Sequence, residues 1–201
     1  MESPDSEALV SELDKLNSSL KSEADIILYQ HGLWEALARH GRPVVMGSYV
    51  MDTMTWADLD LYLTCDAPDA GEFFDLGREI LSRLQPVRLD YHNNLSSHWP
   101  QFPRGLYWGV RTSHGLPRPW KIDIWRLDPT AAQERLEFQA ALQSRITPEC
   151  REAILQIKSH FCSHPRYGMG FSGMDIYTAV LDRGMRSPTQ FEEVLREKGI
   201  E

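Results

Sequence analysis

Apolar residues at helical spacing open the chain. Leucines recur on one helical stripe over residues 9–20, and a second apolar face covers residues 26–40. Ser22 and Asp25 have the spacing of a capping box, which predicts that a new helix begins there. Gly41 predicts the end of that second helix, because glycine readily adopts the left-handed conformation that closes helices. Two N-terminal helices are therefore expected.

A strand-rich block follows, in which the apolar period shortens to two residues. A short apolar run at residues 44–46 ends at Gly47 and Ser48, and leucines alternate with polar residues over 58–63. The block spans about 42–127, which is too short for a doubly wound α/β fold. The other elements expected in it are a helix over residues 70–84 and strands over 87–91, 106–112 and 120–125.

The C-terminal third is predicted to be helical. A capping residue precedes proline three times, at Asp128, Thr147 and Ser187, and each pair predicts the start of a helix. A glycine-rich loop at 168–173 precedes a further helix at about 174–183. These helices are expected to pack together as a separate lobe.

This order of elements predicts an α+β protein in two parts. Residues 1–127 are expected to hold a small mixed sheet backed by helices, including the N-terminal ones, and residues 128–201 a helical C-terminal lobe. The chain has 201 residues, of which 42% are hydrophobic and 25% charged. That composition fits a globular protein with its own core and excludes the disordered and fibrous classes.

Charge and cysteine content narrow the function classes. The net charge of −8 argues against broad binding to duplex DNA, although a small basic pocket remains compatible with it. No apolar run approaches the roughly 18 residues that span a bilayer, and the acidic N-terminus does not resemble a secretory signal. The three cysteines, Cys65, Cys150 and Cys162, form no CxxC pair, so a reduced, cytoplasmic chain is expected.

Asp58 and Asp60 flank Leu59 on a predicted strand. Because successive side chains of a strand alternate between its faces, both carboxylates are expected on one face, with Cα atoms roughly 6.6 Å apart. Neighbouring carboxylates repel each other, and Mg²⁺ relieves that repulsion through its preference for hard oxygen ligands. The spacing alone is weak evidence, because it also occurs in the N-terminal helical sequence, where it predicts a solvated face.

Gly47 and Ser48 strengthen the prediction of a Mg²⁺ site at Asp58 and Asp60, because they close an apolar strand ten residues before that pair. Glycine lets a phosphate approach the backbone closely, and serine adds a hydroxyl donor. A helix that began just after Ser48 would add free N–H groups for an anion. The two residues are therefore candidates for holding a phosphate.

Asp123 stands between two isoleucines on another predicted strand, where a charge needs a partner. A metal shared with the acidic pair would supply that partner. The structural alternative is an ion pair with Lys121 or Arg126. Asp90, on the strand predicted at 87–91, is a rival for the position of the third carboxylate.

A Gly-Ser pair, an Asp-x-Asp strand and a third aspartate on a further strand together resemble the polymerase-β-like nucleotidyltransferase superfamily. The matching stretch, Val44 to Trp125, covers about two fifths of the chain. The resemblance implies transfer of a nucleoside monophosphate from an NTP to a hydroxyl, with two Mg²⁺ ions. It implies that Asp58, Asp60 and Asp123 bind the metal, and that Asp123 helps to deprotonate the acceptor.

The resemblance also implies which residues contact the nucleotide. Gly47 and Ser48 would hold the triphosphate. In the C-terminal lobe, Lys158 on a helix and Ser172 before the next helix are similar to the nucleotide-facing lobe of tRNA-terminal and poly(A)-type transferases. Lys158 would then reach the triphosphate, and Ser172 would lie near the base or ribose.

Aromatic residues gather between Trp99 and Trp120. Most are expected to pack in the core and in loops rather than to form a base-stacking surface. Trp108 and Trp120 are the candidates for lining an acceptor or base pocket.

The predicted function is therefore Mg²⁺-dependent transfer of a nucleotide, from ATP or another NTP, to a hydroxyl of a small molecule or protein, with release of pyrophosphate. The acidic balance and the short chain disfavour a long nucleic-acid acceptor, and a membrane partner is not expected. A homodimer is compatible with these observations. The alternative is a weakly active or inactive nucleotide-binding module on the same fold, such as one partner of a toxin–antitoxin pair.

Overall fold

The computed structural model describes residues 4–96 and 102–200. Contacts divide the chain into two compact units, here named the helical unit and the sheet unit. The helical unit comprises Met1–Leu20, Met51–Trp56 and Leu142–Glu201, and the sheet unit comprises Lys21–Val50 and Ala57–Ala141.

This division differs from the boundary expected between residues 127 and 128. The helical unit takes in the first part of the N-terminal helix and the short segment Met51–Trp56, while most of helix α5 (Pro129–Gln143) belongs to the sheet unit. The reason is that contacts between distant segments define a compact unit, whereas the sequence pattern shows only the order of elements along the chain.

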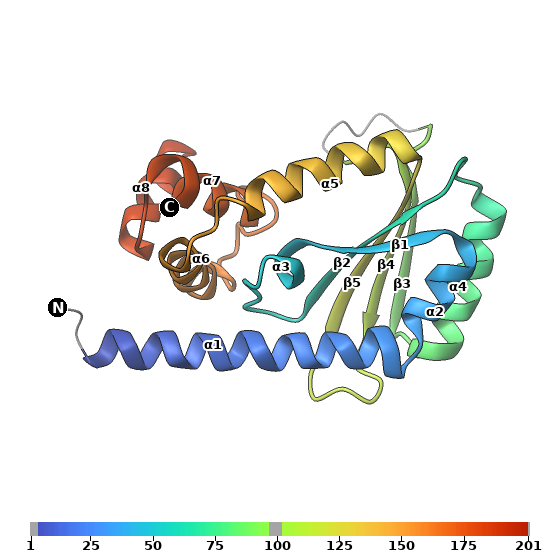
Figure 1. Cartoon of the computed structure of the whole chain (residues 1–201), viewed down its shortest axis with the longest axis horizontal. Coiled ribbons are helices and arrows are strands. Elements are labelled where there is room, and N and C mark those ends of the chain that lie inside the picture. The colour runs from blue at the N-terminus through green and yellow to red at the C-terminus, as the bar shows by residue number, and fades with distance from the viewer. Residues whose placement is uncertain (1–3, 97–101, 201) are drawn as a thin grey trace. The chain divides into compact units, whose positions relative to one another are not determined.

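A five-stranded mixed sheet forms the centre of the sheet unit, with strand order β1-β2-β5-β4-β3 (Figure 1). Within it, β2 and β5 run parallel, and the other three pairs are antiparallel. The strands are β1 (Arg42–Met46), β2 (Asp58–Thr64), β3 (Arg88–Asn93), β4 (Gly105–Thr112) and β5 (Trp120–Leu127). The predicted mixed sheet is confirmed, with strand ends within two residues of the predicted ones.

One face of the sheet packs against helices. Helices α2 (Leu33–His40) and α4 (Ala70–Leu84) lie side by side against it (Figure 1). Leu59, Leu61 and Leu63 of β2 are fully buried. Burying each such side chain stabilises the fold by about 1.5–3 kcal/mol. The acidic positions that alternate with these leucines must therefore lie on the opposite face, here named the polar face.

The N-terminal helix is longer than predicted. Helix α1 covers Pro4–Asp25 and continues into a π-helical turn at Ile26–Gln30. The predicted start of a helix at Ser22 is wrong, because Ser22 lies inside a helix that has already formed and needs no new cap. Leu20 and Ala24 are fully buried near it, so packing carries the helix past the capping signal.

The helical unit confirms the predicted C-terminal helices. Thr147 accepts a hydrogen bond from the N–H of Cys150 (3.3 Å) and Ser187 one from the N–H of Gln190 (3.3 Å), so both act as the expected caps. Among the described residues, none of the helices combines the length and apolar content needed to cross a bilayer. The helices are α6 (Pro148–Phe161), α7 (Gly173–Arg183) and α8 (Pro188–Glu197).

Candidate active site

The three predicted acids meet on the polar face of the sheet. The β2–β5 register pairs Asp60 with Asp123 and Asp58 with Lys121. Paired positions on neighbouring strands point to the same face, and residues two apart on one strand share that face. The structure therefore brings together Asp58, Asp60 and Asp123 on two adjacent strands of one unit.

Lys121 lies between two of these carboxylates. Its Nζ donates hydrogen bonds to Asp58 Oδ1 (3.1 Å) and Asp123 Oδ2 (2.5 Å), and its side chain is 33% exposed. Burial alone would lower the pKa of Lys121, but the charges of Asp58 and Asp123 outweigh burial and raise it. Lys121 is therefore an ammonium at neutral pH inside the acidic cluster, and its ion pair with Asp123 is the structural alternative that the sequence offered for that residue.

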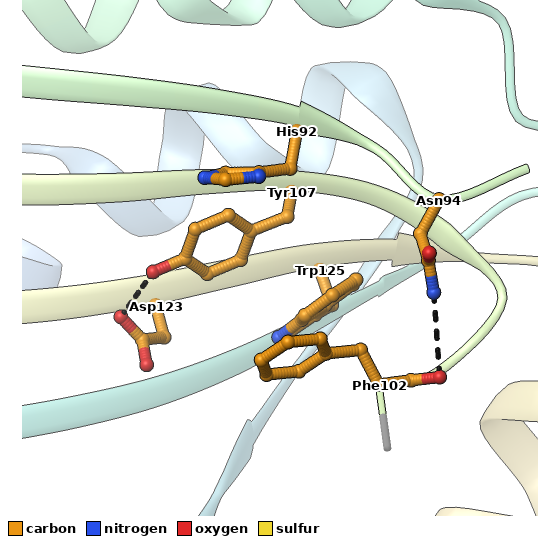
Figure 2. Close-up of a pocket in the computed structure, with 6 residues that line it drawn as sticks. All are labelled: His92, Asn94, Phe102, Tyr107, Asp123 and Trp125. Atoms are coloured by element: carbon orange, nitrogen blue, oxygen red, sulfur yellow. Dashed lines mark hydrogen bonds between the residues drawn. The ribbon is translucent and has the colours of Figure 1, made fainter. Parts of the chain in front are cut away.

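Tyr107 on β4 binds the other oxygen of Asp123. Its hydroxyl donates to Asp123 Oδ1 at 2.9 Å (Figure 2). The Tyr107 ring lies along β4 over Gly109, where there is no side chain in its way. A Cβ at Gly109 would lie 2.5 Å from the Tyr107 hydroxyl. Burial, together with Asp123, raises the pKa of Tyr107, so the phenol stays protonated and acts as a donor. Both oxygens of Asp123 are thus held in place.

Gly47 packs directly against Asp60. It has a φ of 67°, in the left-handed region, and a Cβ at this position would lie 2.3 Å from Asp60 Oδ2. Its N–H donates to Gln139 Oε1 at 2.6 Å. Ser48 follows in α3 (Gly47–Val50), which is a single turn, so the predicted helical anion site is reduced to this short turn. A larger residue here would both strain the backbone and force the Asp60 side chain to move.

Replacing Gly47 with alanine is expected to lower the free energy of unfolding by at least about 1 kcal/mol and to displace Asp60. Gly184→Ala is the matched control, because Gly184 has nearly the same φ, 69°, with open space around it. Urea unfolding and nucleotide binding by both variants test this. Equal losses in the two variants would contradict the close packing of Gly47 on Asp60.

The sheet order decides between the rival third acids. Asp90 on β3 pairs with Gly109 of β4, and β4 and β5 separate it from β2. At about 4.8 Å per strand, Asp90 lies about 14 Å from the Asp58 strand. Asp90 instead accepts a hydrogen bond from Arg88 Nε at 2.9 Å. Asp123, on the adjacent strand, is the better-placed third carboxylate.

The donor set suits a divalent cation in its chemistry, since three carboxylates offer the hard oxygen atoms that Mg²⁺ prefers. In the part of the chain that the structure describes, however, no three His, Cys, Asp or Glu side chains are grouped closely enough to hold a metal ion. The ammonium of Lys121 lies between Asp58 and Asp123 instead. A metal would therefore have to compete with this internal cation.

Lys158 and Ser172 lie in the helical unit, and both make contacts inside it. Lys158 is only 3% exposed; its Nζ donates to the Thr53 carbonyl (2.7 Å) and lies 4.7 Å from the centre of the Trp56 ring. Ser172 caps α7, and its Oγ lies 3.2 Å from Asp175 Oδ2. Their predicted nucleotide contacts stay predictions, and these polar atoms already serve the fold.

Lys158→Met is expected to lower the free energy of unfolding by about 1–3 kcal/mol, because the buried Thr53 carbonyl loses its charged donor while the volume is kept. Lys15→Met, at an exposed site of the same unit, is the control and should change stability by less than about 0.5 kcal/mol. Urea unfolding measures both. If Lys158→Met proves as stable as the control but binds nucleotide more weakly, the nucleotide role is favoured instead.

Comparison with known proteins adds structural relatives. No protein-family model matches the sequence, and no curated protein matches it. The Cid1 poly(U) polymerase bound to MgGTP has a similar structure, with a TM-score of 0.60 and 14% identity over 87% of this chain and 55% of that one. Terminal uridylyl transferase 4 from Trypanosoma brucei with bound UPU gives a TM-score of 0.51 and 14% identity, covering 84% and 59%.

The chain has a nucleotidyltransferase fold. A cytoplasmic RNA terminal U-transferase supports the same assignment, with a TM-score of 0.53 and 12% identity over 85% of this chain and 51% of that one. The predicted fold class and the resemblance to this group of folds are thereby confirmed. The chain spans about half the length of the solved structures it matches, so their activities are not carried over with the fold.

One contact of the acidic cluster has only a weak signal in the sequence. Tyr107 reaches Asp123, and the signal for it was a glycine, Gly109, inside a predicted strand, which marks a close approach of neighbouring groups. Trp108 and Trp120 are buried and donate to Phe73 and Glu23, which confirms the core packing expected for most of the aromatic residues and disfavours the alternative that these two line a pocket. Trp99 lies outside the described residues.

Proposed function

We propose that the protein transfers a nucleoside monophosphate from an NTP to a hydroxyl of a small-molecule or protein acceptor, releasing pyrophosphate. The observation that carries the proposal is the convergence of Asp58, Asp60 and Asp123 from adjacent strands onto one face of a nucleotidyltransferase fold. Residues of this type and in this arrangement suit a polyphosphate held through Mg²⁺.

Asp58, Asp60 and Asp123 would hold the metal, in the two-ion form that the sequence resemblance implies. Bound Mg²⁺ supplies charge neutralisation for the phosphates and lowers the pKa of the attacking hydroxyl. Asp123 accepts the proton of that hydroxyl. The oxygen of the acceptor hydroxyl forms the new bond to the α-phosphorus, and the bond between the α-phosphorus and pyrophosphate breaks. Tyr107 orients Asp123 for this step through its hydrogen bond.

Gly47 and Ser48 are the proposed phosphate contacts. Gly47 has no side chain to block a phosphate, and its N–H, which donates to Gln139 Oε1 in this structure, would exchange that acceptor for a phosphate oxygen. Ser48 adds a hydroxyl donor in the same turn. Lys158 and Ser172 stay predicted nucleotide contacts, and their polar atoms would have to exchange the bonds that they make within the helical unit.

A nucleotide-binding regulatory module is the second candidate. One observation favours it: the Lys121 ammonium already bridges Asp58 and Asp123 and offsets part of the negative charge of the cluster without a metal. In this case Mg²⁺ would add little to nucleotide binding, and no transfer would occur. The two candidates therefore differ in their response to metal and in chemistry.

Thermal unfolding with each NTP, with and without Mg²⁺, tests binding first. A ligand at about 100 times its Kd stabilises the folded state by about 2.7 kcal/mol, and the enzyme hypothesis predicts that this gain requires Mg²⁺. Transfer of α-³²P-labelled nucleotide to candidate acceptors tests the chemistry, with Asp58→Asn as the inactive control. Metal-independent binding without transfer would favour the regulatory module, and no binding of any NTP would overturn both.

A further inference from the structure

A pocket of about 200 Å³ lies beside Asp123 on the polar face (Figure 2). Aromatic rings make up most of its wall, and the Asp123 carboxylate with the Tyr107 hydroxyl forms one polar end. The described residues that line it all belong to the sheet unit. The lining residues are His92, Asn94, Phe102, Tyr107, Asp123 and Trp125.

The sheet register builds the aromatic wall. Trp125 of β5 pairs with Tyr107 of β4, which in turn pairs with His92 of β3, so the three rings form one row across the sheet. On the same face of the sheet, the next row of residues, two positions along each strand, contains Asp123. Residues that are distant in sequence therefore place a flat, half-buried aromatic surface next to the proposed catalytic carboxylate.

Phe102 closes the pocket on one side. Its ring stacks against Trp125 with centroids 5.9 Å apart and an interplanar angle of 27°. The buried Asn94 side chain fixes the backbone here by donating to the carbonyls of Phe102 (3.3 Å) and Pro103 (2.8 Å) (Figure 2). The buried amide therefore fixes the backbone at Phe102, whose half-exposed ring stacks on Trp125 at the side of the pocket.

The size and chemistry of the pocket select its ligand. Sites for whole drug-sized ligands measure about 300–1,000 Å³, so this pocket holds about one ring and leaves the rest of a molecule outside. Aromatic walls favour a planar ring, because stacked and edge-to-face contacts add to simple burial. The acidic end and the net charge of −8 disfavour a polyanion.

The position of the pocket separates it from the proposed phosphate site. Gly47, at the end of β1, packs on Asp60 of β2, whereas the pocket lies over β5, β4 and β3. The two sites therefore flank the acidic cluster from opposite sides along the sheet. A nucleotide bound at Gly47 would leave the pocket available for the second substrate.

We propose that this pocket binds the acceptor, and that the acceptor is a small, uncharged molecule with one aromatic or heteroaromatic ring near its hydroxyl. The inference rests on the proposed transfer reaction, because it assigns Asp123 the role of proton acceptor. With the ring against Trp125 and Phe102, a hydroxyl one or two bonds away lies at the Asp123 end of the pocket.

Binding without nucleotide or metal tests the pocket on its own. The probes are two pairs measured by ligand-observed NMR: benzyl alcohol against cyclohexylmethanol, and adenosine against ribose. Both members of each pair carry a hydroxyl, but only the first member carries an aromatic ring. The wild type is expected to bind the aromatic member of at least one pair more tightly than its partner. Tighter binding of benzyl alcohol indicates an aryl alcohol as acceptor, and tighter binding of adenosine indicates a nucleoside.

Phe102→Leu and Phe138→Leu form a matched pair of variants, because both phenyl groups are about half exposed (45% and 51%) and Phe138 lies outside the pocket. Phe102→Leu is expected to weaken binding of the aromatic probe about 3- to 10-fold, and Phe138→Leu is expected to leave that binding unchanged. Trp125→Leu is expected to weaken binding of the same probe about as much as Phe102→Leu does. Thermal unfolding checks that the Trp125→Leu variant folds.

Equal binding of the two members in both pairs would overturn the proposal, as would equal effects of Phe102→Leu and Phe138→Leu. Tighter, Phe102-dependent binding of a uridine hexanucleotide than of adenosine would overturn the assignment to a small uncharged acceptor. None of these outcomes depends on transfer. A protein that binds the rings as expected but fails to bind any NTP would retain the pocket and lose the proposed function.

Discussion

Replacing Asp60 with alanine is expected to reduce nucleotide transfer by at least about 10³-fold while changing the free energy of unfolding by less than about 1 kcal/mol. Transfer is expected to fall because one of the three carboxylates proposed to bind the metal is lost. Stability is retained because removal of one carboxylate relieves repulsion among three acids on one face. Labelled-nucleotide transfer and urea unfolding measure the two effects separately.

Asp90→Ala is the control for this experiment. Asp90 lies in the same register row as Asp123 but two strands farther from β2, and it pairs with Arg88. Its replacement should leave transfer unchanged within about 2-fold. An Asp60→Ala protein that unfolds much more easily yet still transfers nucleotide would contradict the assignment, and so would loss of transfer in Asp90→Ala.

Lys121→Met is expected to make the protein less stable without Mg²⁺ and more responsive to Mg²⁺ than the wild type. Loss of the ammonium removes the positive charge from the Asp58 and Asp123 carboxylates, which are only 20% and 17% exposed. Breaking a fully buried pair costs about 3–5 kcal/mol, and partial solvation reduces the expected cost here to about 1–3 kcal/mol. Thermal unfolding in EDTA and in Mg²⁺ measures both effects.

The control is Lys121→Arg, which keeps a positive charge and should keep the small magnesium response of the wild type. Because the pKa of Lys121 is raised in the folded state, its contribution to stability is complete below the ordinary lysine value of about 10.4 and is lost as the pH rises above it. The stability difference between wild type and Lys121→Met should therefore be constant from about pH 6 to 9. Equal magnesium responses of Lys121→Met and Lys121→Arg would contradict competition between Lys121 and the metal.

Much of the sheet was predictable because its signal is local. The alternation of Leu59 and Leu61 with aspartates gives the strand and its buried face directly, and the cap at Thr147 gives a helix start. Ser22 shows where a local signal fails. It has the spacing of a cap, but burial of Leu20 and Ala24 in the surrounding packing keeps the helix continuous.

The site was only partly predictable because its remaining parts depend on register. The residue types and spacing of Asp58 and Asp60 indicated one shared face, whereas the bridge from Lys121 to Asp58 requires knowing that β2 and β5 are adjacent and parallel. The aromatic pocket requires two further pairings, of β3 with β4 and of β4 with β5. A single sequence contains no local signal for such long-range pairings.

The most direct measurement is a crystal structure with Mn²⁺ and a non-hydrolysable NTP analogue, in which anomalous scattering locates the metal. The account predicts Mn²⁺ bound by Asp58, Asp60 and Asp123, with the triphosphate beside Gly47 and the Lys121 ammonium displaced from between Asp58 and Asp123. Analogue bound with no Mn²⁺ at these three carboxylates, or bound with its metal elsewhere in the chain, would contradict it.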